Sequence, residues 1–197
     1  MITISQRVLH AIDSIERGEY EYALEDATIA IDVSARRRVG KSQSARSDYK
    51  AFLSEYFWVI ELMALNGIDL EKSVFANLTI EGVSVPKLPD LIYHVVRCGL
   101  VHSTGLPSNL AFVPGRVASF SHEQISLPAQ VIWGLLASVV FAKVNASEKS
   151  VGDYFFTCES SRFLIRDSWG KADLLRPLYD SHVKVRVALN ITPFPKP

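Results

Sequence analysis

Apolar side chains recur at intervals of three and four residues along the first third of the chain, which places them on one face of a helix. This spacing predicts three helices, over residues 3–16, 19–38 and 45–65. Gly18 and Gly40 follow the first two, and glycine is favoured directly after a helix end. The third has the widest aromatic and aliphatic face, which is typical of a helix in the core of a bundle.

The same spacing returns after Pro89-Asp90 and predicts a fourth helix over residues 89–103, packed near the second. A fifth is expected over residues 128–145. The stretch from Ile125 to Ala142 has no charged residue and reaches the length of a membrane span. Its polar residues, and a proline suited to a first helical turn at position 128, favour a buried core helix. Membrane contact is the alternative interpretation.

Shorter segments between and after these helices indicate strands. A small hairpin is expected around Glu81-Gly82, a second one joins residues 110–113 and 117–125 around Pro114-Gly115, and further strands are expected over 154–158 and 162–166. Residues 172–179 resemble a short helix interrupted at Pro177. Apolar and polar residues alternate from 183 to 191, which predicts a strand with one buried and one solvated face.

The predicted fold class is therefore mainly α. We expect an antiparallel bundle of four to five helices with small antiparallel β additions, namely a hairpin after the fourth helix and a C-terminal strand. The bundle would occupy residues 1–150, and residues 151–197 would form a small α/β extension packed on the same domain. A chain of 197 residues can bury its core without disulfides or metals.

The charges balance, with 21 basic and 21 acidic residues, which argues against a broad electrostatic surface for nucleic acid. One local basic cluster remains, formed by Arg36, Arg37, Arg38, Lys41 and Arg46. It has two interpretations. It could contact an RNA backbone beside the fourth helix, or it could be a solvated helix end, where cations suit the helix dipole.

The two cysteines, Cys98 and Cys158, are far apart and lack the spacing of metal ligands. We expect them to be buried thiols in the reducing cytoplasm, because no signal-peptide pattern opens the chain. The sequence has no glycine-rich phosphate loop, no serine elbow and no spaced ligand set, so neither a metal nor a cofactor is expected.

An arginine followed after four or five residues by a histidine occurs three times. The pairs are Arg97 and His102, Arg116 and His122, and Arg176 and His182. Only the first pair lies on a strongly amphipathic helix that follows three others. Its helix also carries the apolar pair Leu100-Val101 directly before the histidine.

This helix resembles the signature helix of HEPN domains, a family of helical bundles with an arginine, a polar residue and a later histidine. The resemblance implies a metal-independent ribonuclease that acts as a homodimer, in a toxin or phage-defence system with an antitoxin-type protein partner. His102 would then move protons near neutral pH. Arg97 would stabilise charge on the phosphate through its planar guanidinium group.

The alternative is a HEPN-like dimerisation or interaction module without enzymatic activity. Cys98 stands where the family usually has a polar residue, and many members of the family are inactive. Five residues along an α-helix also turn the two side chains roughly 140° apart. A site shared between two facing helices, or a helix distorted near Gly99, would bring them together.

Overall fold

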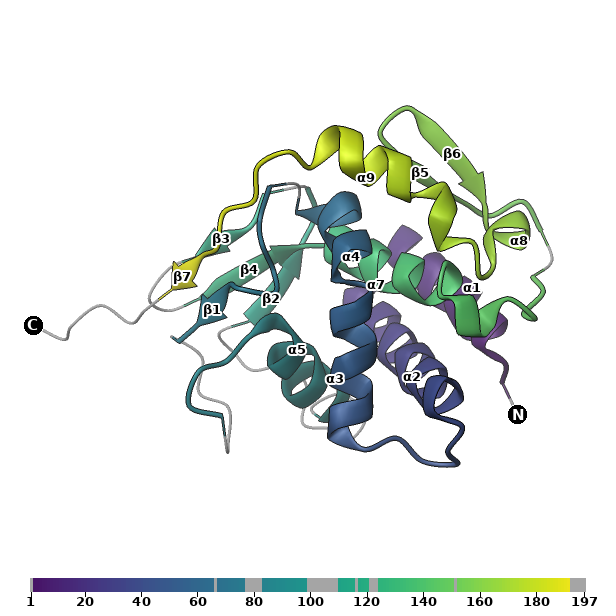
Figure 1. Ribbon diagram of the computed structural model, residues 1–197, viewed down its shortest axis with the longest axis horizontal. Coiled ribbons are helices and arrows are strands. Elements are labelled where there is room, and N and C mark those ends of the chain that lie inside the picture. Colours follow the sequence, from purple (N-terminus) through teal and green to yellow (C-terminus); the bar gives the residue numbers. More distant parts are fainter. Residues whose placement is uncertain are drawn as a thin grey trace, which may run out of the picture.

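The computed structural model describes residues 2–65, 67–76, 83–98, 110–115, 117–120, 124–150 and 152–191, with the backbone alone at 95–98, 120 and 191. Helices dominate these residues, and the strands form small separate sheets, as Figure 1 shows. The prediction of a mainly α protein with minor β additions is confirmed at this level. The pairing of the strands differs from the prediction and is described below.

The first two helices lie along one another. They are α1 (Ile4–Glu16) and α2 (Tyr20–Val39), and both match their predicted segments to within one residue. Thr3 and Gln6 form a reciprocal capping box at the start of α1. Gly40 ends α2 in the left-handed conformation, with φ of 66°, which a residue with a β-carbon adopts only under strain.

The predicted third helix is divided in two at Tyr56, so its prediction as one helix was wrong. The segments are α3 (Arg46–Glu55) and α4 (Phe57–Ala64), and Tyr56 has φ of −110° and ψ of 13°. The Tyr56 ring is buried against Phe52, and its hydroxyl accepts a hydrogen bond from the backbone N–H of Lys143. Residues 46–64 contain no glycine or proline, so the sequence has no local signal for this break.

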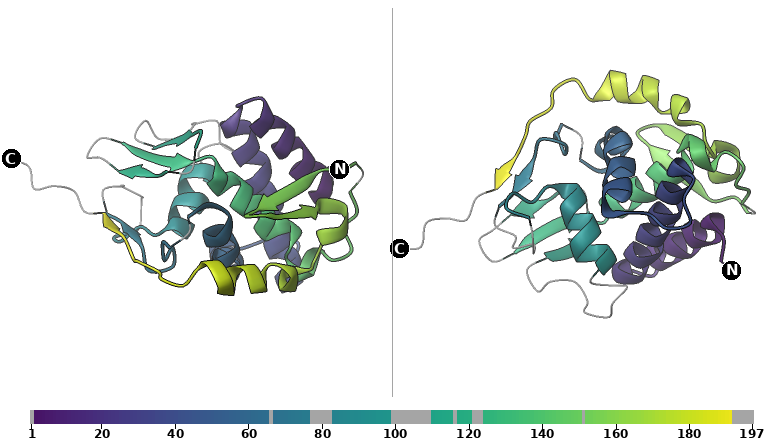
Figure 2. Two further views of the ribbon diagram at one scale, coloured as in Figure 1. Left: turned by 90° about the horizontal axis from the view of Figure 1, so that it is seen from above. Right: turned by 60° about the horizontal axis from the view of Figure 1, so that its bottom comes forward.

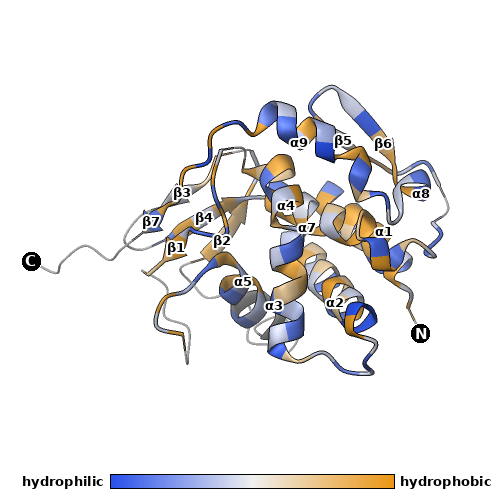
Figure 3. Cartoon of the chain, viewed as in Figure 1, coloured by the Kyte–Doolittle hydropathy of each residue, from blue (hydrophilic) through white to orange (hydrophobic). Residues whose placement is uncertain are grey.

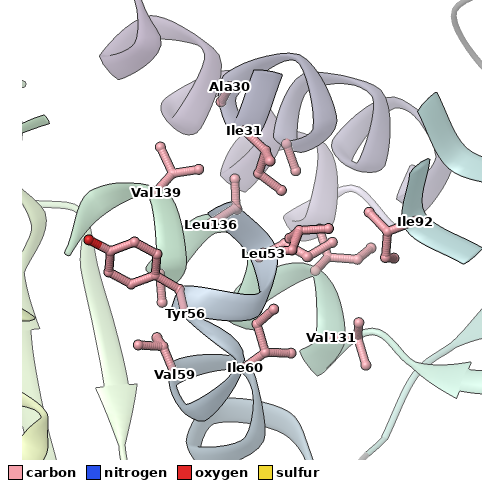
Figure 4. Packing of buried hydrophobic residues seen from close by; sticks show 14 of the residues in the cluster. Ala30, Ile31, Leu53, Tyr56, Val59, Ile60, Ile92, Val131, Leu136 and Val139 are labelled. Carbon is pink, nitrogen blue, oxygen red and sulfur yellow. The ribbon is translucent and has the colours of Figure 1, made fainter. Parts of the chain in front are cut away.

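The uncharged stretch begins as strand β4 (Ile125–Pro128) and becomes a helix only at α7 (Gln130–Val140), which ends in a turn, η2 (Lys143–Asn145). α7 packs against α4 and α2. Its apolar residues join those of the other helices in one core, part of which is drawn in Figure 4. Figure 3 shows α7 as a largely hydrophobic helix. Over the ranges that the structure covers, every helix is too short or too polar to pass through a bilayer.

A three-stranded sheet adjoins this core, with the strands β2 (Leu110–Val113), β4 and β3 (Ser119–Phe120) in that order. β4 lies in the middle, parallel to β2 and antiparallel to β3. The predicted hairpin around Pro114-Gly115 was therefore wrong. Ile125 and Leu127 of β4 are buried, as are Leu110 and Phe112 of β2, so the parallel register places the apolar side chains of both strands in the core.

The predicted strands near residues 154–166 form an antiparallel hairpin, β5 (Phe155–Cys158) and β6 (Ser161–Leu164), which confirms that pair. Short helical segments follow: α8 (Ile165–Ser168), η3 (Ala172–Leu174) and α9 (Arg176–His182). Pro177 lies in the first turn of α9 instead of interrupting a helix, because its missing N–H is not needed there. Phe156 and Ile165 belong to the same core as the N-terminal helices.

The final segment crosses the molecule as an extended arm, visible in Figure 2. It pairs in parallel with residues 68–75 through Ile68 and Val187 and through the strands β1 (Val74–Phe75) and β7 (Asn190–Ile191). The predicted strand with one buried face was wrong, since Val185 is 70% exposed and Val187 is 56% exposed. The predicted hairpin around Glu81-Gly82 falls on residues 77–82, outside the described residues.

Candidate functional site

The helix predicted to carry the arginine–histidine motif, called the motif helix below, begins where the sequence predicts. It starts as α5 (Leu88–Asp90) and continues as η1 (Leu91–Cys98), which is wound as a π-helix. The Asp90 carboxylate accepts the N–H of Lys87 at 3.1 Å, and Pro89 lies in the first turn. π-Helical turns are rare and occur often at functional sites. Leu88 and Leu91 are fully buried and hold the helix on the core.

The motif helix lies against α2 and α3, which confirms that the second and fourth predicted helices are neighbours. Arg97 lies within η1, and only its backbone is described. His102 lies outside the described residues, as do Arg116 and His122. The convergence of the Arg97 and His102 side chains therefore stays a prediction.

The third arginine–histidine pair lies fully within the described chain, and both of its groups interact locally. Arg176 pairs with Asp180 one turn later at 3.6 Å and lies over the Trp58 ring. The Nδ1 atom of His182 lies 2.9 Å from the carbonyl oxygen of Leu178. These contacts are typical of a helix end, and both groups of this pair interact with residues of their own helix.

Two cations beside the start of the motif helix share one buried carboxylate. The Lys50 Nζ atom lies 2.6 Å from Oδ1 of Asp90, and a guanidinium nitrogen of Arg46 lies 3.4 Å from the same oxygen. Arg46 also lies over the Tyr93 ring at 5.9 Å. Burial alone would raise the pKa of Asp90, but hydrogen bonds from Lys50, Lys87 and Arg46 outweigh it and lower that pKa. Together, Arg46, Lys50 and Asp90 therefore carry a net charge of +1.

The four residues predicted to bind RNA each have an acidic partner. The pairs are Arg36 with Asp32 at 3.3 Å, Arg37 with Glu148 at 2.7 Å, Arg38 with Glu55 at 2.6 Å, and Lys41 with Asp48 at 3.0 Å. Because every cation is balanced, this cluster has little net charge. Ion pairs at the surface are weak, however, and a phosphate can compete for the cation. Their RNA-binding role stays a prediction.

Sequence reasoning missed a second polar cluster, in which Glu61 of α4 is fully buried. Its carboxylate accepts hydrogen bonds from the Leu70 N–H at 3.0 Å, the Tyr179 hydroxyl at 3.0 Å and Arg186 at 2.7 Å. Arg186 also reaches Asp69 at 3.1 Å. The partners are up to 125 residues apart, so no local pattern reveals them. The cluster fastens the C-terminal arm to the helical core.

The hydrogen bond to Glu61 and the surrounding charges raise the pKa of Arg186, so its guanidinium stays charged. Burial and then the Glu61 charge raise the pKa of Tyr179, so its hydroxyl stays protonated and keeps donating. Groups with fixed protonation near neutral pH suit a structural role better than proton transfer. Within the described ranges, no three His, Cys, Asp or Glu side chains are grouped to hold a metal ion.

A mostly helical fold with small sheets thus gives the structural class of the protein. A family model described as Rv1289 matches residues 3–194, nearly the whole chain, so the protein belongs to the Rv1289 family. Relatives are the uncharacterized protein Rv1289 of Mycobacterium tuberculosis H37Rv and the uncharacterized protein Mb1320 of Mycobacterium bovis. Each is 25% identical over 199 residues, covering 96% of this chain and 93% of its own. No solved structure matches the chain.

Proposed function

We propose that the protein is a HEPN-like, metal-independent endoribonuclease that binds RNA through the motif helix and cleaves it with Arg97 and His102. The proposal extends to an antiparallel bundle of four to five helices, a cytoplasmic homodimer with the two motif helices facing each other, and an antitoxin-type protein partner. The observation that carries it is the motif helix itself. Its first turn contains the buried Asp90, and the segment that includes Arg97 is a π-helix. Such winding is common where a helix carries a function.

The chemistry needs only the RNA and these two side-chain types. The 2′-hydroxyl attacks the adjacent phosphorus, the new bond closes a 2′,3′-cyclic phosphate, and the bond to the 5′-oxygen breaks. A histidine takes the 2′-proton or gives a proton to the leaving 5′-oxygen, and a homodimer supplies one histidine for each task. Arg97 stabilises the charge on the phosphorane through two parallel hydrogen bonds.

The surplus charge at Arg46, Lys50 and Asp90 supports the proposal. It lies at the first turn of the motif helix, where an RNA strand running along the helix would place a phosphate. Because Asp90 already holds both cations in position, binding a phosphate would cost little further side-chain freedom. The affinity for RNA should fall with added salt, as for any phosphate contact.

The second candidate is a non-catalytic HEPN-like dimerisation module. The ion pairs of Arg36, Arg37, Arg38 and Lys41 favour it, since they leave that surface close to neutral. In this case the motif helix would form only the subunit interface. The two candidates differ in one respect that an assay can measure, namely cleavage of RNA.

The test incubates the full chain with end-labelled RNA in excess EDTA. The proposal expects cleavage that survives chelation and falls by roughly 10²–10⁴ in His102→Ala, the usual contribution of a general acid or base. The cleavage rate of Arg97→Ala should fall by a similar factor. Arg97→Lys should cleave little faster than Arg97→Ala, because a lysine cannot form the bidentate contact. His182→Ala is the matched control and should cleave normally.

Equal cleavage by the parent protein and His102→Ala would assign the activity to another group or a contaminant. Absence of cleavage, together with dimers that Arg97→Ala disrupts, would favour the interaction module. Lys50→Met should weaken RNA binding without abolishing turnover, since Lys50 lies at the start of the helix and not at the motif.

A further inference from the structure

A cavity of about 550 Å³ opens between α1, α4, α7 and the segment that leads into β5. Its size falls in the range of small-molecule sites. Trp133 and Phe156 form an edge-to-face pair in its wall, with ring centroids 6.0 Å apart, and Met63 adds a polarizable sulfur. Such walls suit an aromatic ring, which gains both burial and directional contacts there.

The polar groups of this cavity offer hydrogen-bond acceptors. Gln130 lines it, and its Oε1 atom is buried without a hydrogen-bond partner among the residues described. A buried acceptor without a partner is costly, so it indicates a missing donor. The Tyr154 hydroxyl donates its proton to Asp13 at 3.0 Å and so presents its oxygen as a further acceptor.

The charges at the mouth of the cavity also favour a ligand that donates hydrogen bonds. Glu16 lines the cavity, is exposed and makes no ion pair within the described part of the chain. Asp153 lines it too, although Arg166 pairs with it at 2.6 Å. Another cation, Arg162, lies 3.3 Å over the ring of Phe155, which also lines the cavity. An incoming group that donates hydrogen bonds and carries positive charge would therefore meet Glu16 first.

We propose that this cavity binds an aromatic amine, with its ring between Trp133 and Met63 and its ammonium group at Glu16. One N–H of the ligand bonds to Oε1 of Gln130. The site shares no residue with the motif helix, and this proposal is independent of RNA cleavage.

The test is isothermal titration calorimetry of the full chain with three ligands of similar size and different charge. 2-Phenylethylamine is the cation, 2-phenylethanol the neutral analogue and 3-phenylpropionate the anion. The proposal expects the amine to have a Kd at least tenfold lower than that of either analogue. Amine binding that is absent at millimolar concentration, or no tighter than binding of the alcohol or the anion, overturns the proposal.

Two variants and a control locate the site. Glu16→Gln should raise the Kd of the amine about tenfold, equivalent to about 1.4 kcal/mol, and leave the Kd of the alcohol unchanged. Glu21→Gln, an exposed carboxylate in the first turn of α2, should change neither. Gln130→Leu should weaken amine binding and raise the Tm of the free protein, because it removes the unpartnered oxygen. An unchanged Kd in both Glu16→Gln and Gln130→Leu contradicts the proposed site even if the amine binds elsewhere.

Discussion

Replacing Arg186 by methionine tests whether the Glu61 cluster fastens the C-terminal arm. The variant keeps an apolar stem of similar size but removes the guanidinium group that lies 2.7 Å from Glu61 and 3.1 Å from Asp69. Both carboxylates are almost completely buried, at 0% and 4% side-chain exposure. They would be left charged with only neutral donors and the exposed Lys72 nearby.

Removing one partner of a buried ion pair costs about 3–5 kcal/mol. Arg186 is 34% exposed, and Glu61 keeps the Leu70 N–H and the Tyr179 hydroxyl, so we expect the lower end, about 3 kcal/mol. With a urea m-value of about 2 kcal/mol/M, the unfolding midpoint should fall by about 1.5 M. Chemical unfolding followed by circular dichroism measures this shift directly.

Two further variants distinguish the effect of the Glu61 cluster from the effect of losing any positive charge. Arg166→Met removes a cation whose partner Asp153 is well exposed, and it should cost less than about 1 kcal/mol. Adding Glu61→Gln to Arg186→Met should recover part of the loss, because the buried charge that lacked its partner is gone. A midpoint for Arg186→Met within about 0.5 M of that of the parent protein would refute this reasoning.

Two further predictions concern acid stability and core packing. Burial would raise the pKa of Asp69, but hydrogen bonds from Lys72 and the charges of Arg186 and Lys72 outweigh it and lower that pKa; the pKa of Asp90 is lowered by similar contacts. Their stabilisation is therefore complete above the ordinary aspartate pKa of about 3.9 and lost as the pH falls through the lowered values. Urea midpoints should be flat from neutral pH to about 5 and fall below about 4, and Asp69→Asn should flatten that fall; an equally steep fall in Asp69→Asn contradicts this assignment. Gly134→Ala would place a β-carbon 3.0 Å from the Cα atom of Ile60, where α4 and α7 meet. The strain should exceed the roughly 1 kcal/mol gained in helix propensity and lower the Tm, whereas a higher Tm would show that the two helices can separate freely.

Local patterns predicted the helices well where the periodic side chains face one core. Ile4, Val8 and Ile12 repeat at helical spacing, and all three are buried in α1. Prolines and glycines gave correct boundaries at Gly40 and Pro89. In each case the signal lies within a few residues of the structure that it specifies, so the sequence alone was sufficient.

Prediction failed where a distant partner decides the conformation. Tyr56 separates α3 from α4, and its hydroxyl meets Lys143, a residue far away in the sequence. β2 pairs with β4 instead of the nearer β3, and that register buries the apolar faces of both strands. The alternation of residues 183–191 does describe an extended segment, but the short strands beside it leave much of it exposed. Strand pairing depends on contacts that no short window contains.

At the candidate site too, local features could be predicted from the sequence and contacts between separate helices could not. The start of the motif helix and its position beside α2 follow from local spacing and the apolar face. The pairing of Lys50 and Arg46 with Asp90, and the acidic partners of Arg36 and Arg38, depend on how separate helices pack. The local run of basic residues in the sequence therefore overstates the cationic surface that RNA would meet.

The chemistry of the cleavage products tests the proposed ribonuclease most directly. An RNA oligonucleotide cut by the protein in excess EDTA is analysed by mass spectrometry, next to the same oligonucleotide with 2′-O-methyl groups at every position. Attack by the 2′-hydroxyl under the control of Arg97 and His102 predicts 2′,3′-cyclic phosphate and 5′-hydroxyl ends, with the methylated strand left intact and both ends lost in His102→Ala. Cleavage of the methylated strand, 3′-hydroxyl ends, or no cleavage by the parent protein at any RNA tested would contradict the account.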